Sequence, residues 1–184
     1  KFLDLPPDVL VTVMRKHQRY FPVENNDGEL LPYFIAVRNG DEDHIKTVTN
    51  GNEHVLQARF SDADFFYKDD IKKPLSDYLP RLATLTFQVK LGSMLDKNQR
   101  VTGLIVEVGD LFGMDFVEVV IAEHAAEIAK ADLATNMVIE MTSLQGTMGR
   151  EYARKSGYPL EVADVIYEHW LPRNADDALP STPA

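Results

Sequence analysis

The sequence predicts an α+β, mainly helical protein, in which a small N-terminal α/β hairpin part precedes a helical bundle. Two β-rich runs flank a turn-forming cluster before residue 40, and from residue 92 onward apolar residues recur with a helical period of about 3.6. We expect residues 1–90 to form the α/β part with its helical connection. Residues 91–173 are expected to form the helical domain, and residues 174–184 a flexible tail because they combine turn residues with few apolar ones.

The N-terminal part is expected to contain one helix and one hairpin. Residues 6–8 (PPD) predict a helix start, since proline suits the first turn and Asp8 suits the positive end of the helix dipole. Two β-rich runs, 20–23 and 31–37, flank the Asn-Asn-Asp-Gly cluster at 25–28. That arrangement is typical of a β-hairpin.

The stretch after the hairpin is expected to be helical up to residue 83. Ser61 with Asp64 three residues later matches a capping box, which predicts a helix start there. Pro74 predicts another helix start, and Pro80 is expected to end or kink that helix. Residues 84–90 alternate like a strand, but so short a run is equally compatible with a helix or a loop.

The C-terminal part is expected to be helical throughout. One helix is predicted from Leu95 to a stop at Gly113, and Asp115 with Glu118 forms a capping signal for the next. Residues 130–154 predict two helices joined by a tight corner near Gly146. A last helix is expected at 159–170, after Gly157.

Composition excludes several classes of protein. There are no cysteines, which rules out disulfides and cysteine-based zinc sites, and no apolar run approaches the ~20 residues of a membrane span. The net charge of −10 repels nucleic acid on average. Residues 1–90 contain 12 basic and 14 acidic residues, whereas 91–184 contain 7 and 15, so an RNA contact would need a local basic patch.

Two clusters of cations are candidates for such a patch. Both also fit solvated helix faces, where basic side chains favour the negative end of the dipole. The first cluster, at residues 15–19, lies beside Tyr20 and Phe21, and this mixture of cations and aromatic rings suits phosphate contact and base stacking. The second cluster, at residues 150–155, contains Glu151, whose negative charge weakens its attraction for phosphate. Lys72, Lys73, Lys97 and Arg100 are interpreted as solvated surface residues. The candidate RNA-binding residues are Arg15, Lys16 and Arg19 in the first cluster, and Arg150, Arg154 and Lys155 in the second.

Four segments together resemble one protein family. They are residues 17–40 (HQRYFPVENNDGELLPYFIAVRNG), 51–70 (GNEHVLQARFSDADFFYKDD), 79–100 (LPRLATLTFQVKLGSMLDKNQR) and 130–154 (KADLATNMVIEMTSLQGTMGREYAR). They resemble the bacterial glycyl-tRNA synthetase β subunit and occur in the family's order. Because that β chain is several times longer, we expect this sequence to be an internal fragment.

The resemblance implies a role within a cytoplasmic ligase of α2β2 composition. In that family the α subunit holds the site for ATP and glycine, and the β subunit supplies contacts to tRNA(Gly). The fragment is therefore expected to be noncatalytic and to bind no cofactor, while it supports the β subunit and helps to place the tRNA acceptor arm. A pure protein–protein interaction module without RNA contact is the alternative.

The helical part resembles the HD domain, whose active members bind a metal through a His…His-Asp…Asp set. Asp132 stands at the expected Asp, but Ala131 replaces the expected histidine, and His124 is the nearest histidine before it. Two ligands are too few for a stable site. We therefore expect no metal and treat Asp132 as a vestigial, helix-capping residue with a partly buried His124 nearby. A metal-dependent phosphohydrolase is the alternative from another class.

Overall fold

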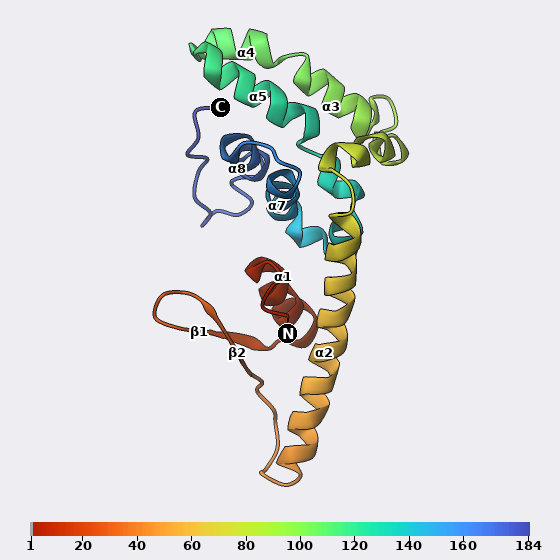
Figure 1. The fold of residues 1–184 in the computed structure, drawn as a ribbon, viewed down its shortest axis with the longest axis vertical. Helices are drawn as coiled ribbons and strands as arrows, with labels where there is room; N and C mark the ends of the chain where they lie inside the picture. Colours follow the sequence, from red (N-terminus) through yellow and green to blue (C-terminus); the bar gives the residue numbers. More distant parts are fainter. Residues whose placement is uncertain (1) are drawn as a thin grey trace. The chain divides into compact units, whose positions relative to one another are not determined.

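The computed structural model describes residues 2–184, apart from the side chain of His17. The chain forms two compact units, Lys1–Asp69 and Asp70–Ala184, and each is described by itself. Most described residues are helical and two small two-stranded sheets accompany them, which confirms an α+β, mainly helical fold (Figure 1). No described helix is long and apolar enough to cross a membrane.

The first unit combines two short helical segments, a hairpin and one long helix. Strands β1 and β2 pair antiparallel, with Phe21 opposite Ile35, and the turn contains Gly28 at φ 80°. The Asn25 side chain accepts hydrogen bonds from the backbone N–H groups of Asp27 and Glu29, which fixes this turn and confirms the predicted hairpin. The elements are α1 (Pro7–Thr12), the π-helical η1 (Val13–His17), β1 (Phe21–Glu24), β2 (Leu30–Ile35) and α2 (Ile45–Asp70).

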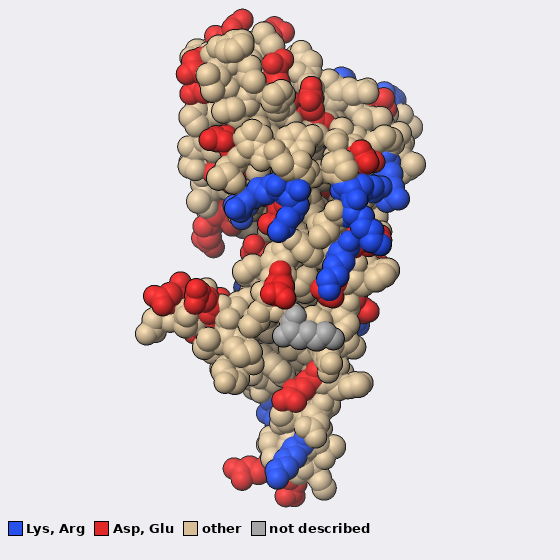
Figure 2. All heavy atoms as spheres, viewed as in Figure 1, with Lys and Arg blue, Asp and Glu red and all other residues tan. Residues whose placement is uncertain are grey.

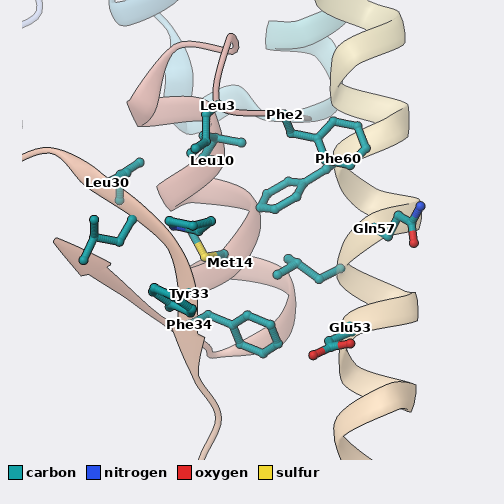
Figure 3. Close-up of a pocket in the computed structure, with 13 residues that line it drawn as sticks. Phe2, Leu3, Leu10, Met14, Leu30, Tyr33, Phe34, Glu53, Gln57 and Phe60 are labelled. Carbon is teal, nitrogen blue, oxygen red and sulfur yellow. The ribbon is translucent and has the colours of Figure 1, made fainter.

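An apolar hollow of about 230 Å³ lies within this unit, between α1, the hairpin and α2 (Figure 3). Leu10 and Met14 face it from the N-terminal helical segments, and the rings of Phe2 and Phe60 lie 5.5 Å apart at its side. Its lining is mostly apolar, and the polar side-chain atoms come from Tyr33, Glu53 and Gln57. The hollow thus belongs to the packing of this unit and contains no group of catalytic residues.

The predicted helix start at Ser61 is wrong, because α2 runs without interruption through this point. The Ser61 hydroxyl donates to the Gln57 carbonyl one turn back, at 2.9 Å, and Asp64 pairs with Lys68 at 2.7 Å. A capping box can act only where backbone N–H groups lack helical partners. In the interior of a helix the same residues form ordinary contacts along one face.

The second unit begins with a 3-10 segment, η2 (Leu75–Thr84), and a small ribbon formed by β3 (Thr86–Gln88) and β4 (Gly92–Ser93). Pro74 precedes η2 as predicted, but Pro80 lies inside η2 and does not end it. The fixed φ of proline near −65° suits a 3-10 segment, and only one N–H is lost. Leu75 and Leu82 are buried where η2 packs on the helices.

The helices of the second unit confirm several local signals and contradict one. The helix predicted to run from Leu95 to Gly113 is broken at Gly103, since glycine is a poor helix former there. Gly113 ends the second piece at φ 70°, and the Asp115–Glu118 capping box has both of its hydrogen bonds. These helices are α3 (Met94–Thr102), α4 (Ile105–Phe112), α5 (Phe116–Ile128), α7 (Thr147–Lys155) and α8 (Leu160–Glu168).

The chain between α5 and α7 is more broken than predicted. In place of one helix it forms η3 (Ala131–Ala134), α6 (Asn136–Glu140) and η4 (Thr142–Leu144). The buried Thr135 side chain causes the first break, because it bonds the Asp132 carbonyl at 2.7 Å and accepts from Val138 N–H. The predicted corner is confirmed at Gly146, which has φ 76° and begins α7.

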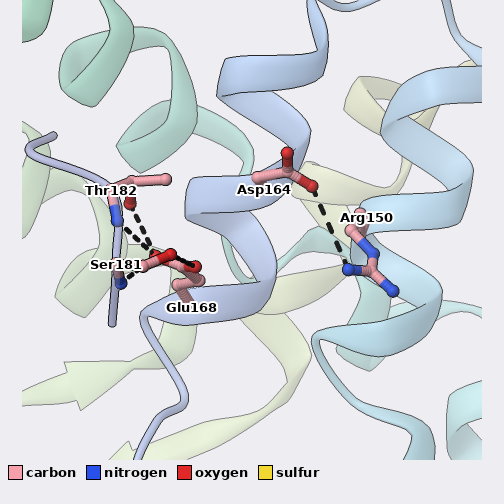
Figure 4. A network of polar contacts seen from close by, with 5 residues as sticks. All are labelled: Arg150, Asp164, Glu168, Ser181 and Thr182. Carbon is pink, nitrogen blue, oxygen red and sulfur yellow. Dashed lines mark hydrogen bonds and ion pairs between the residues drawn. The ribbon is translucent and has the colours of Figure 1, made fainter. Parts of the chain in front are cut away.

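Residues 174–184 contain no described helix or strand, and they return to the end of α8. Glu168 accepts hydrogen bonds from both backbone N–H and hydroxyl groups of Ser181 and Thr182 (Figure 4). The backbone N–H of Thr182 is the largest cause that lowers the pKa of Glu168 to about 2. The flexibility of residues 174–184 and the predicted domain boundary near residue 90 stay predictions. The division between the two compact units of the structure falls between Asp69 and Asp70.

Candidate RNA-contact residues and the Asp132 cluster

Asp132 is a structural capping residue in this fold. It is completely buried in η3, and its Oδ2 accepts a hydrogen bond from Gly146 N–H at 2.6 Å, at the N-terminus of α7. Gly149 lies in the first turn of the same helix, where a Cβ atom would come within 3.0 Å of Oδ2. The glycine therefore lets α7 approach the carboxylate. Asp132 therefore caps a helix as predicted. The helix it caps is α7, through the N–H of Gly146, 14 residues further along the chain.

The cluster around Asp132 is electrostatically unusual. Burial raises the pKa of Asp132 to about 6, although the Gly146 N–H and the charge of Lys130 act in the opposite direction. Burial lowers the pKa of Lys130 to about 8, and burial with the charge of Lys130 lowers the pKa of His169 to about 4. At neutral pH the Lys130 ammonium therefore donates to the neutral His169 Nε2, 2.6 Å away.

Trp170 closes this cluster. The Lys130 ammonium lies 3.5 Å from the centre of the indole ring, and a Cβ atom on Gly146 would collide with that ring. The indole Nε1 and the Asp132 Oδ1 are buried without a hydrogen-bond partner. Burial of two polar atoms in this way costs stability and makes the cluster sensitive to substitution.

The residues present do not fit a metal of the HD type. Ala131 is completely buried where the resemblance places a histidine, and His124 is exposed on α5, contrary to the expected partial burial. Among residues 2–184, no three His, Asp or Glu side chains converge as ligands would. A two-ligand site with one carboxylate engaged in capping does not meet the requirements of a transition metal.

The first cation cluster is exposed, as an RNA contact requires. Arg15 and Lys16 project from η1, and Arg19 follows with a positive φ of 54°. Tyr20 is 8% exposed and stacks on Phe34 with ring centres 4.9 Å apart, so it belongs to the core and cannot stack on a base. The aromatic half of the sequence argument is therefore wrong for this residue, whereas the cations stay candidates.

The second cation cluster is partly engaged within the protein. Arg150 lies 4.0 Å from Asp164 (Figure 4) and 4.5 Å from the centre of the Tyr167 ring. Lys155 approaches Glu151 at 3.9 Å, while Arg154 is exposed on the same helix. These contacts give Arg150 a clear packing role between α7 and α8. RNA binding by this cluster stays a prediction.

Two features escaped the sequence analysis because they join distant segments. Asp70, which is 2% exposed, accepts hydrogen bonds from Asn136 N–H, Met137 N–H and the Tyr152 hydroxyl, each at 2.9 Å. A carboxylate at the C-terminus of a helix is unfavourable by itself, and that anomaly at the end of α2 was the available signal. The second feature is a hollow of about 300 Å³ that brings Lys72 and Lys73 together with Lys155.

Figure 2 shows one face of the molecule with Lys and Arg in blue and Asp and Glu in red. On this face Lys and Arg side chains gather beside α7, although the whole chain contains more Asp and Glu (29) than Lys and Arg (19). The fold and these sites define a mainly helical α+β protein with a capping aspartate at the candidate metal position and cations gathered locally on an acidic chain.

Comparison with known proteins identifies the family. The profile of the family described as "Glycyl-tRNA synthetase beta subunit" matches residues 1–184. The glycine–tRNA ligase beta subunit of Shouchella clausii is 50% identical over 183 residues, and that of Clostridioides difficile is 49% identical over 183; each alignment covers 100% of this chain and 26% of the relative. That of Halothermothrix orenii is 48% identical over 181 residues, which cover 98% of this chain and 26% of the relative.

The chain belongs to the glycyl-tRNA synthetase beta-subunit family. It spans about a quarter of the length of these relatives.

Proposed function

We propose that this chain is a noncatalytic part of a cytoplasmic glycine–tRNA ligase of α2β2 composition. In this proposal it supports the β subunit through an HD-like bundle and helps to place tRNA(Gly) for aminoacylation. The α subunit uses ATP and glycine, and this part of β binds no cofactor.

The observation that carries the proposal is the family match over residues 1–184. Two structural features support it. Asp132, the residue at the candidate metal position, is occupied as a helix cap, which favours a scaffold over a hydrolase. Arg15, Lys16 and Arg19 are exposed cations on a chain of net charge −10, which favours a local contact with phosphates.

The test uses Arg15→Glu with Arg19→Glu in full-length β, assembled with α. Glycyl-adenylate formation and tRNA charging are measured on the same preparation. We expect charging to fall at low tRNA concentration while adenylate formation is kept, because in this proposal the altered residues contact tRNA, whereas ATP binds the α subunit. Unchanged charging in a folded variant would remove this cluster from the contact surface, and equal loss of both steps would indicate damage to the α–β assembly.

A protein–protein interaction module is the second candidate, and the α4–α5 region favours it. Leu111, Phe112 and Phe116 are 79%, 82% and 82% exposed. Clusters of large exposed apolar residues commonly mark surfaces that another protein covers. Replacement of Phe112 and Phe116 by serine in full-length β would weaken assembly if this surface binds protein, with tRNA affinity of any assembled enzyme unchanged.

A further inference from the structure

We propose that the hollow around Lys72, Lys73 and Lys155 binds a backbone phosphate of tRNA. This inference rests on the proposed function and names a contact site for it in the second unit. It differs from the sequence-based expectation, in which Lys72 and Lys73 were solvated residues without a common target.

The hollow is built from two segments that are far apart in the sequence. The chain that follows α2 supplies Lys72, Lys73 and Tyr78, and the C-terminal half of α7 supplies Tyr152 and Lys155. Ser156 ties the segments together, since its hydroxyl accepts from Leu75 N–H at 2.9 Å and donates to the Tyr152 carbonyl at 2.6 Å. The hollow is therefore a defined part of the fold. Its volume of about 300 Å³ leaves room for a phosphate group.

A buried carboxylate in the lining could oppose an anion, but both oxygens of Asp70 are engaged by donors of the protein. Both of its oxygens accept hydrogen bonds from backbone N–H groups at the start of α6, and Tyr152 donates a further one. The Tyr78 hydroxyl donates to the Asp70 carbonyl at 3.1 Å. Charge-assisted bonds of this kind stabilise the carboxylate within the protein. The hydrogen bonds hold both Asp70 oxygens within the fold, and three lysines line the same hollow as this one carboxylate.

Lys73 and Lys155 make only contacts that a ligand can compete with. Lys73 lies over the Tyr78 ring, with its ammonium 4.1 Å from the ring centre. Lys155 is 3.9 Å from Glu151, and its side chain is 55% exposed. Exposed ion pairs contribute little to stability, so a phosphate can compete for Lys155 at little cost.

The chemistry of the site favours a phosphate of a nucleic-acid backbone. Lysine ammonium groups are flexible point charges that bind phosphate without fixing one geometry, unlike the planar fork of arginine. Such contacts position a nucleic acid without reading its sequence. A carboxylate-rich protein partner would also be attracted, and it is an outcome that the test separates.

The test compares two double variants of full-length β in the assembled α/β enzyme. Lys73→Gln with Lys155→Gln removes two charges from the hollow. Lys90→Gln with Arg100→Gln removes two charges from exposed positions of the same unit outside it. The dissociation constant for a tRNA(Gly) transcript is measured at several salt concentrations.

We expect the hollow variant to bind tRNA about tenfold or more weakly at 0.1 M salt. Its log–log salt dependence should be shallower by roughly 0.7 to 0.9, since the loss of one phosphate contact removes about that much. The control should match the wild type, and Lys73→Arg with Lys155→Arg should restore binding. Equal weakening of both double variants would overturn the proposal, because it would reflect net charge alone.

Other results distinguish this proposal from the function on which it rests. If the hollow variant binds like the control while Arg15→Glu with Arg19→Glu weakens binding, the hollow is not a contact but the proposed function stands. If neither set changes tRNA affinity, both fail. Loss of α–β assembly with normal tRNA affinity of the remaining complex would assign the hollow to an acidic protein partner and overturn the RNA proposal.

Discussion

Asp132→Asn is expected to make this protein more stable at neutral pH and to reduce its pH dependence. Burial raises the pKa of Asp132 to about 6, from an ordinary value of 3.8. Between pH 3.8 and about 6, the Asp132 carboxyl group therefore keeps a proton in the folded state that it releases in the unfolded state. Asparagine keeps the acceptor for Gly146 N–H and never ionises, so it represents the protonated form at every pH.

The sign and size follow from proton linkage. Between pH 3.8 and about 6 the folded state binds more protons than the unfolded state, so the free energy of unfolding falls as pH rises. Each unit of pKa difference corresponds to about 1.4 kcal/mol, so this residue costs about 3 kcal/mol above pH 6. We expect the stability difference between Asp132→Asn and wild type to grow by about this amount from pH 4 to pH 7.

Guanidinium unfolding at pH 4, 5, 6 and 7 measures this difference. Trp170 is the single tryptophan and lies beside Gly146, so its fluorescence reports on the region around Asp132. Asp132→Ala is the matched comparison, and it should destabilise at every pH because it removes the cap of α7. A constant difference between Asp132→Asn and wild type across this pH range would refute the reasoning, since it would mean that Asp132 titrates normally.

Three further predictions concern the same unit. Gly146→Ala should lower the free energy of unfolding by about 2 kcal/mol or more, because its φ of 76° and the Trp170 ring both oppose a side chain. Gly157 has a φ of 85° but open space around it, so Gly157→Ala should lower the free energy of unfolding by only about 1 kcal/mol. Chemical denaturation of the two variants compares these costs. Tyr152→Phe should cost about 1.5 to 3 kcal/mol through its lost hydrogen bond to Asp70, with Tyr158→Phe nearly neutral in the same experiment. Elemental analysis of purified protein should find no stoichiometric manganese, iron or zinc, and one metal per chain that is lost on Asp132→Ala would restore the hydrolase hypothesis.

Signals that act between neighbouring residues predicted their elements well. The Asn25 turn, the Asp115–Glu118 capping box and the positive φ of Gly113 and Gly146 are all present where the sequence places them. Each depends on hydrogen bonds or sterics within a few residues. Such features can be read from a single sequence because their cause lies within it.

Signals that depend on context failed. Ser61 and Asp64 match a helix start, yet α2 continues through them because its backbone bonds are already made. The helix expected up to Gly113 breaks at Gly103, because glycine has a weak preference for helix. A local motif indicates which hydrogen bonds a residue is able to make. Whether it makes them depends on the backbone structure around it.

At the sites that join distant segments, the sequence could at most mark one residue as unusual, as with the carboxylate of Asp70 at the end of α2, and could not identify its partners. Asp70 caps α6 from 66 residues away. Lys72 and Lys155 line the same hollow only because η2 packs on α7. Sequence spacing carries no information about such meetings. Asp132 was found through its resemblance to a known motif, but its pKa and its cap of α7 depend on burial that only the fold reveals.

Site-specific crosslinking of the assembled α/β enzyme to tRNA(Gly) tests the central claim most directly. A photoreactive amino acid replaces Lys16 or Lys72 in full-length β, and Lys90 serves as the exposed control. The proposed function predicts a crosslink to tRNA from position 16, and the inference about the hollow predicts one from position 72. Unlabelled tRNA(Gly) should compete both away, and position 90 should give little. Crosslinks from positions 16 and 72 to protein alone, with none to tRNA, would contradict a tRNA-positioning role and identify this chain as an interaction module.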